Sequence, residues 1–187
     1  VLGVVGLVAV AVTIFSPPLH PALPWNLVAG EAKNSDPCTI DQHFRHAPEV
    51  ERQFDLGVFS LNHGRLADAE AAMWTVLKAD PTHTPAGVNL SWLLLQKGSN
   101  DTAAQIARRV LDVDECDDKA WANLSTASMR LGEKALALKA ARRAAAIDPY
   151  NPGYWASLGE GLMANGNRDG ARTYFERAVK WRPEMWQ

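Results

Sequence analysis

The sequence predicts an all-α solenoid of four helix-turn-helix repeats, preceded by a transmembrane helix and an extended connector. Three observations in the 187 residues support this prediction: an internal period of 34 residues, a break containing Gly within each period, and an apolar run at the start. The period is the most informative of the three, because a repeat determines the whole architecture.

The period appears when the chain is compared with itself at a shift of 34 residues. The shift aligns Trp155 with Trp121, Gly166 with Gly132 and Pro183 with Pro149. Four copies follow, over residues 50–83, 84–117, 118–151 and 152–185. One hairpin of this length cannot bury its own apolar face, so the copies are expected to stack on one another.

Each copy is predicted to fold as two helices. The first helix carries apolar residues at helical spacing, as at Trp155, Leu158 and Leu162. A break containing Gly follows, where Gly supplies a left-handed residue at the helix end. The second helix is rich in Ala on one face, and Asp-Pro ends it at residues 80–81 and 148–149, because Pro cannot continue a helix.

The fourth copy resembles the tetratricopeptide repeat (TPR). The pattern W-x2-L-G-x2-Y…A-x3-F-x2-A…P is met by Trp155, Leu158, Gly159, Leu162, Ala171, Phe175, Ala178 and Pro183. Leu162 stands where the family has Tyr, while the second and first copies have Gly87 and Gln53 in the place of the Trp. The resemblance covers residues 50–185 and implies a right-handed solenoid whose concave groove binds proteins.

Composition narrows the class of partner. A net charge of −2 argues against nucleic acid, because binding to phosphates needs a basic stripe. Basic residues such as Arg108 and Arg109 are predicted to lie on a solvated outer face. We therefore expect protein partners, with neither a nucleic acid nor a small-molecule substrate.

Residues 1–15 form an apolar run in which Thr13 is the one polar residue. As a helix this run spans about 22 Å, short of the roughly 30 Å hydrocarbon core. We predict that it is the end of a longer transmembrane helix, in which Gly3, Gly6 and Ala9 permit close helix packing. An uncleaved signal peptide and a buried core helix are the alternatives.

Residues 16–49 are predicted to be a Pro-rich extended connector, because a segment such as SPPLHPALPW ends a helix and is stiff. No Lys or Arg precedes Lys33, so the flank of the apolar run lacks the charge typical of a cytoplasmic side. We expect a single-pass membrane protein whose repeats lie on the periplasmic or extracytoplasmic side.

The two cysteines of the chain are Cys38, in the connector, and Cys116, between the second and third copies. In a TPR stack this junction shares one edge with Val50, and the twelve residues from Cys38 to Val50 reach about 40 Å when extended. A disulfide is therefore predicted, and it requires an oxidising compartment. Two unrelated thiols are the alternative.

No metal, cofactor or catalytic site is expected. Cys38, His43 and His46 fit no zinc spacing, and the CxxCH motif for haem is absent from the sequence. His63 and His83 fall in repeat turns and are expected to be exposed loop residues. The sequence contains no Gly-rich phosphate loop, GxSxG or HExxH, so the chain is not predicted to be an enzyme.

The TPR resemblance places partner contacts on the first helix of each copy. The groove predicted in this way contains Phe54, Val58, Leu61, Val88, Trp92, Leu95, Met129 and Glu160. Chaperone-binding TPR domains need Lys and Asn where this chain has Phe54 and Val58, so acidic C-terminal peptides are not expected to bind. An apolar patch of this kind is typical of a partner groove. Inter-repeat core, or a groove filled by the connector itself, is the alternative.

No later helix in the given sequence covers Trp181, Met185 and Trp186, so we expect either further residues of the chain or a contact with another subunit at this end. We predict a membrane-tethered extracytoplasmic scaffold subunit that mediates protein–protein interactions within a larger membrane complex. One alternative is a periplasmic assembly factor that presents client proteins of the cytochrome c, pilus or secretion type. A remote alternative is a metal- or cofactor-binding enzyme subunit.

Overall fold

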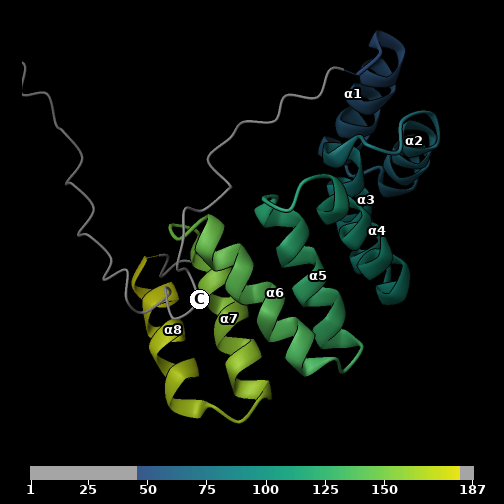
Figure 1. Cartoon of the computed structure of the whole chain (residues 1–187). Helices are drawn as coiled ribbons and strands as arrows, with labels where there is room; N and C mark the ends of the chain where they lie inside the picture. The colour runs from purple at the N-terminus through teal and green to yellow at the C-terminus, as the bar shows by residue number, and fades with distance from the viewer. Residues whose placement is uncertain (1–45, 182–187) are drawn as a thin grey trace, which may run out of the picture.

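The computed structural model describes residues 46–181, which form eight α-helices and, over this range, no strand (Figure 1). The helices follow one another as antiparallel hairpins, each lying close to one predicted copy. Their bounds are α1 (Pro48–Asn62), α2 (Leu66–Ala79), α3 (Thr84–Lys97), α4 (Asn100–Val113), α5 (Asp118–Arg130), α6 (Lys134–Ile147), α7 (Pro152–Ala164) and α8 (Arg168–Trp181).

The same turn joins the two helices of every hairpin. The residues with positive φ, between 70° and 83°, are Gly64, Gly98, Gly132 and Gly166. The residue after each of them donates its backbone N–H to the carbonyl five residues earlier, as from Ser99 to Leu94 at 2.9 Å. A left-handed residue is strained with any side chain, so the predicted role of these glycines is confirmed.

A second turn joins successive hairpins, and an Asp begins it each time. Asp80, Asp114 and Asp148 end α2, α4 and α6, and the Oδ1 atom of each accepts a hydrogen bond from the backbone N–H two residues later, at 2.9–3.1 Å. The Asp side chain therefore forms this turn even after α4, where no Pro follows Asp114.

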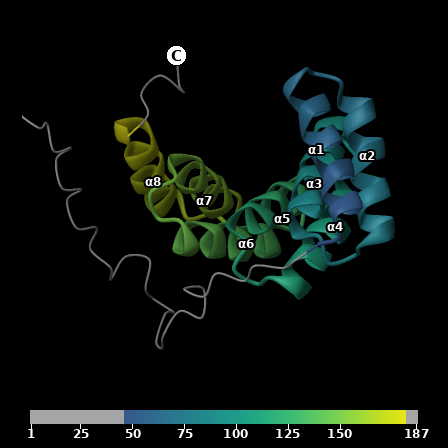
Figure 2. The ribbon, with the colours of Figure 1, turned by 90° about the horizontal axis from the view of Figure 1, so that it is seen from above.

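The hairpins stack into an arc. Figure 2 shows α1, α3, α5 and α7 along its inner side and the even-numbered helices along its outer side. Close packing depends on small residues: Ala69, Ala103, Ala137 and Ala171 hold one equivalent position in the second helices, and all four are 0% exposed. The predicted Ala face is thereby confirmed.

The core consists of one large cluster over the first three hairpins, a second cluster over the last two, and a small third cluster of Val88, Val110 and Ala120. Trp121 on α5 is partly buried and packs against the first two clusters. Successive hairpins therefore bury apolar side chains against one another, as stacking repeats require.

Several predictions concern residues outside the described range. These are the helix over residues 1–15 with Gly3, Gly6 and Ala9, residues 16–45 of the connector, and the end contacts Met185 and Trp186. Among the helices of residues 46–181, none combines the length and apolarity needed to cross a bilayer.

Candidate functional site

Two members of the predicted groove prove to be core residues. Val88 is 8% exposed and packs in a cluster with Val110 and Ala120, and Leu95 is 3% exposed in the large core cluster. The prediction that these two side chains line an open groove is wrong. Their positions on α3 face the second helix of the same hairpin and the next repeat, where close packing excludes a partner.

The other groove residues reach the surface. Trp92 on α3, an inner helix of the arc, is 42% exposed. Phe54, Val58 and Leu61 on α1 are half-buried against the core, so part of each side chain remains accessible. Met129 is half-buried and Glu160 exposed, on α5 and α7. Among the predicted groove residues, the accessible apolar side chains therefore lie mainly on the first two inner helices, α1 and α3.

Backbone carbonyls hold neighbouring inner helices in register. Asn123 Nδ2 donates to the carbonyl of Val88 at 3.1 Å and to Ser91 Oγ at 2.7 Å, which ties α5 to α3. Arg130 Nη1 donates to the carbonyl of Leu95 at the other end of the same helix pair. The surface around Trp92 is therefore presented by a fixed pair of helices.

Further exposed apolar side chains lie at the two ends of the array, outside the predicted contact surfaces. Leu56 and Phe59 on α1 are 52% and 51% exposed, and Met163 and Val179 in the last hairpin are 46% and 43% exposed. The last two line a shallow hollow together with Phe175 and charged residues of α8. Phe59 and Val179 lie away from the first-helix positions at which the family binds partners. Leu56 holds the position of Leu158, which is buried, so the pattern did not reveal its exposure.

His83 is the clearest departure from expectation: it was predicted to be an exposed loop residue, and it is 1% exposed. It is the N-cap of α3, and its Nδ1 accepts a hydrogen bond from the backbone N–H of Ala86 at 3.1 Å. Asp117 and Asn151 hold the equivalent positions and cap α5 and α7, Asp117 by accepting from Ala120 N–H and Asn151 by accepting from Gly153 N–H. The alignment of the copies therefore contained a signal that position 83 is an N-cap, because Asp and Asn, which hold this position in the later copies, are favoured N-caps. His63, in contrast, is exposed as predicted.

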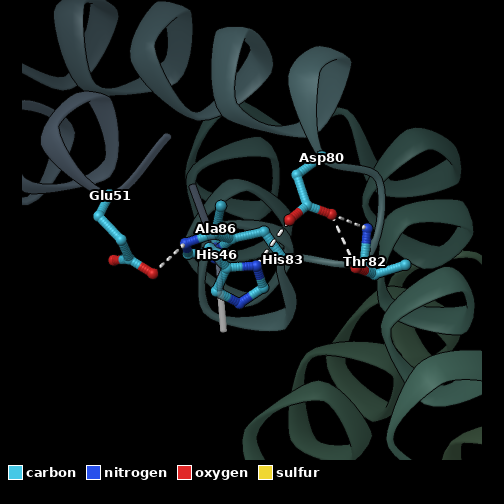
Figure 3. A network of polar contacts seen from close by, with 6 residues as sticks. All are labelled: His46, Glu51, Asp80, Thr82, His83 and Ala86. Atoms are coloured by element: carbon cyan, nitrogen blue, oxygen red, sulfur yellow. Dashed lines mark hydrogen bonds and ion pairs between the residues drawn. The ribbon is translucent and has the colours of Figure 1, made fainter. Parts of the chain in front are cut away.

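A polar cluster surrounds His83 (Figure 3). The ring of His46 stacks on it at a centroid distance of 4.2 Å, and His46 Nδ1 lies 2.6 Å from Asp80 Oδ2. Glu51 Oε1 lies 3.7 Å from His83 Nε2, which is too long for a hydrogen bond. Of the buried side-chain nitrogen and oxygen atoms within residues 46–181, His83 Nε2 is the one with no hydrogen-bond partner.

Electrostatics in this cluster oppose protonation of His83 and favour the charged form of Asp80. Burial, and next the nearby His46, lower the pKa of His83, although Glu51 acts in the opposite direction. Hydrogen bonds from Thr82 and then from His46 lower the pKa of Asp80 to about 2. A neutral imidazole and a carboxylate therefore lie on either side of the His46 ring.

Cys116 is half-buried in the turn between α4 and α5 and is not a free cysteine. Its predicted partner, Cys38, lies outside the described residues. The pairing of these two cysteines stays a prediction.

Comparisons with known proteins agree on the family. The tetratricopeptide repeat model matches residues 56–183. A solved structure of MamA is 24% identical, covers 72% of this chain and 73% of its own, and superposes with a TM-score of 0.64. MamA 41-end from Desulfovibrio magneticus RS-1 is 21% identical, with 72% and 76% covered and a TM-score of 0.64.

A thermophilic TPR protein from Thermus thermophilus is 19% identical, with 72% and 75% of the two chains covered and a TM-score of 0.63. No curated protein matches the chain. The matched repeats, the four equivalent turns and the arc of inner and outer helices lead to one conclusion. The chain belongs to the tetratricopeptide repeat family, whose solenoids are scaffolds for protein–protein interaction.

Proposed function

We propose that this chain is a membrane-tethered extracytoplasmic scaffold, which binds a protein partner through the apolar inner surface of its first two hairpins. The observation that carries the proposal is Trp92: it is 42% exposed on an inner helix, although a Trp side chain gains free energy from burial. Tryptophan is also enriched among the residues that dominate binding energy at protein interfaces.

The shape and chemistry of this surface suggest how the partner binds. Phe54, Val58 and Leu61 recur on one side of α1, and each leaves part of its side chain accessible beside the core. An amphipathic helix or an apolar extended segment fits such a surface, because its apolar side chains lie against an inner helix while its polar face stays in water. Buried apolar area contributes about 25 cal/mol per Å² before the costs of association.

One substitution tests the groove, and the chain offers a matched control. Trp92→Glu places a charge on the inner helix α3, whereas Trp74→Glu places the same charge on the outer helix α2, at a Trp that is 39% exposed. We expect Trp92→Glu to lower partner affinity by about 30-fold or more, as for an interface residue that contributes about 2 kcal/mol. Trp74→Glu is expected to change it little.

The measurement is extraction of the full chain from its native membrane in mild detergent, followed by sizing and mass spectrometry of the proteins that copurify. A partner at fixed stoichiometry that is lost with Trp92→Glu but kept with Trp74→Glu supports a structural scaffold. Partners present only in small and varying amounts would instead indicate an assembly factor. Binding that survives in both variants contradicts the groove.

The tether is a separate part of the proposal. It is supported by the apolar run over residues 1–15, which carries no charged residue, and by the absence of Lys and Arg before Lys33. Protease treatment of intact and of permeabilised cells tests the location of the repeats. If the repeats resist the protease in intact cells and are cleaved when only the outer barrier is opened, the extracytoplasmic location is supported. Protection that persists until the inner membrane is broken contradicts it.

A further inference from the structure

We propose that His46, Glu51 and His83 form a binding site for a divalent transition-metal ion, with Zn²⁺ as the ion that fits best. One ligand atom from each of the three residues lies within 4.8 Å of the other two. The residues come from the chain just before α1, from α1 and from the turn before α3, so the site joins the start of the array to the second hairpin (Figure 3). This inference is independent of the groove.

His46 keeps one ring nitrogen available for an ion, although its ring must turn from its present stack on His83 to bind one together with it. Its Nδ1 lies 2.6 Å from Asp80 Oδ2, so Nε2 is the nitrogen that remains for an ion. Asp80 is itself held by Thr82, whose backbone N–H and hydroxyl donate to Oδ1 at 2.9 Å and 2.7 Å. A carboxylate that accepts the second ring N–H of a histidine is the usual support of a metal-binding imidazole, since it sets both the tautomer and the angle of the ring.

His83 provides the evidence that a ligand is missing. Its Nε2 is buried with no hydrogen-bond partner, and Glu51 Oε1 lies 3.7 Å away, close enough for a shared ion but too far for a hydrogen bond. Buried polar atoms in native proteins are nearly always paired, and an exception calls for a specific cause such as an ion. An ion between Nε2 and the Glu51 carboxylate would give both groups a partner once the ring proton has moved from Nε2 to Nδ1.

The capping hydrogen bond of His83 determines which ring nitrogen carries the proton, and metal binding must change this. Because Nδ1 accepts from Ala86 N–H, the proton of the neutral ring lies on Nε2. An ion at Nε2 replaces that proton, and the ring takes a proton at Nδ1, so the imidazole stays neutral and gives up the bond to Ala86. Metal binding therefore competes with the cap, and the ring must turn slightly away from Ala86.

The first repeat is the only described part of the array in which these ligands meet. The cap at position 83 is Asp117 and Asn151 in the next two copies, so capping does not require a histidine. Position 51 corresponds to Pro85, Lys119 and Gly153, none of which offers an imidazole or carboxylate ligand. The repeat scaffold alone does not account for a histidine pair beside a carboxylate.

The donor set selects the type of ion. Two imidazoles and one carboxylate suit Zn²⁺, with water as a fourth ligand, whereas Mg²⁺ and Ca²⁺ prefer oxygen ligands alone. Ligand bonds of about 2.0–2.2 Å require the three atoms to move closer together than their present spread of up to 4.8 Å. The side chain of Glu51 is 45% exposed and is the ligand best able to make this movement.

The test is calorimetric titration of the full chain, free of any affinity tag and stripped with a chelator, with Zn²⁺. His83→Asn removes Nε2 but keeps a capping oxygen, as Asn151 does naturally, and Glu51→Gln removes the anionic ligand. Loss of even a supporting partner costs about 10–100-fold in metal affinity, so each variant is expected to lose about 100-fold or more. The controls are His63→Ala and Glu49→Gln, at exposed positions outside the cluster.

Two readouts decide the outcome. In the wild type, Co²⁺ in place of Zn²⁺ is expected to give the intense visible absorption of a tetrahedral site, and Zn²⁺ is expected to raise the melting temperature. His83→Asn is expected to remain folded by circular dichroism and to lose both responses, while the controls keep them. The proposal is overturned if wild-type affinity is weaker than about 1 mM, a level reached by weak extracellular metal modules. It is equally overturned if His83→Asn binds Zn²⁺ like the wild type.

Discussion

The phenol of Tyr154 on α7 donates a hydrogen bond to Asp118 Oδ2 on α5, at 2.5 Å and across 36 residues of sequence. Tyr154 is 8% exposed. Burial raises the pKa of Tyr154 far above its ordinary value, and the bond to Asp118 raises it further, so the hydroxyl keeps its proton. This bond fixes the register between the inner helices of the third and fourth repeats.

Tyr154→Phe is therefore expected to lower the free energy of unfolding by about 2 kcal/mol, as for other hydrogen bonds to charged groups. Urea denaturation followed by circular dichroism measures the change. In a double-mutant cycle with Asp118→Ala, which removes the acceptor, we expect a coupling of about 1 kcal/mol or more between the two side chains. Additive effects in that cycle would show that the bond does not stabilise the stack.

Gly87→Ala is expected to destabilise the second repeat. A Cβ atom at this position would clash with Val110 Cγ2, and overpacking of this kind costs about 1–3 kcal/mol. The clash outweighs the gain of about 1 kcal/mol in helix propensity, because Val110 is buried and has one favoured rotamer in a helix. Thermal and urea unfolding of the variant measure the net change in stability, which combines the clash and the gain in helix propensity.

Val110→Ala provides the rescue for that variant. The double variant Gly87→Ala, Val110→Ala is expected to be more stable than the sum of the two single effects by about 1 kcal/mol, since the smaller side chain makes room for the new methyl group. Strict additivity would show that the backbone, rather than Val110, absorbs the extra atom.

Asp117→Asn tests the buried cap of α5. Oδ1 of Asp117 accepts from the backbone N–H of Ala120 at 2.7 Å, while burial, which outweighs that bond, raises the pKa of Asp117 above 3.8. A raised pKa means that the folded state binds this proton more tightly, so the contribution of Asp117 to stability falls as the pH rises through its raised pKa. Asn keeps the capping oxygen without the charge.

At about pH 7 we therefore expect the free energy of unfolding of Asp117→Asn to equal that of the wild type or to exceed it by about 1 kcal/mol or less. This advantage should disappear below the ordinary carboxyl pKa of 3.8, where Asp117 is protonated in both states. Urea unfolding of both proteins at several pH values between these limits checks the trend. A variant that loses stability at neutral pH would show that the charge is favourable at the N-terminus of the helix.

Substitutions within the repeat pattern illustrate what can be predicted from sequence. Gly87 stands where later copies have Trp121 and Trp155, a departure that the pattern alone does not explain. The structure supplies the reason: Val110 fills the space beside Gly87, whereas Ala144 and Ala178 hold the position of Val110 in the copies that keep the Trp. A large side chain on one helix is matched by a small one on the other.

The fold could be predicted from the sequence because it depends on signals between residues close together in the chain. The spacing of apolar residues, the four turn glycines and the Asp residues at the helix ends act over a few neighbours in the chain, so a repeat of these signals predicts a repeat of hairpins. Phe54, Val58 and Trp92 were assigned to the groove by the TPR resemblance, which implies contacts on the first helix of each copy. How far each side chain reaches the surface is a matter of contacts between repeats, and Val88 and Leu95 show that the pattern alone does not decide it.

By itself, the sequence determined the solenoid: four stacked hairpins follow from periodicity and turn chemistry, which are properties of short segments. Only the tertiary structure decided that His83 is buried and that His46, Glu51 and Asp80 gather around it. His46 and Asp80 are separated by one full period, so no local spacing signals their contact. The stacking of the first hairpin on the second brings these groups together. It also buries His83, so that its Nε2 is left without a hydrogen-bond partner.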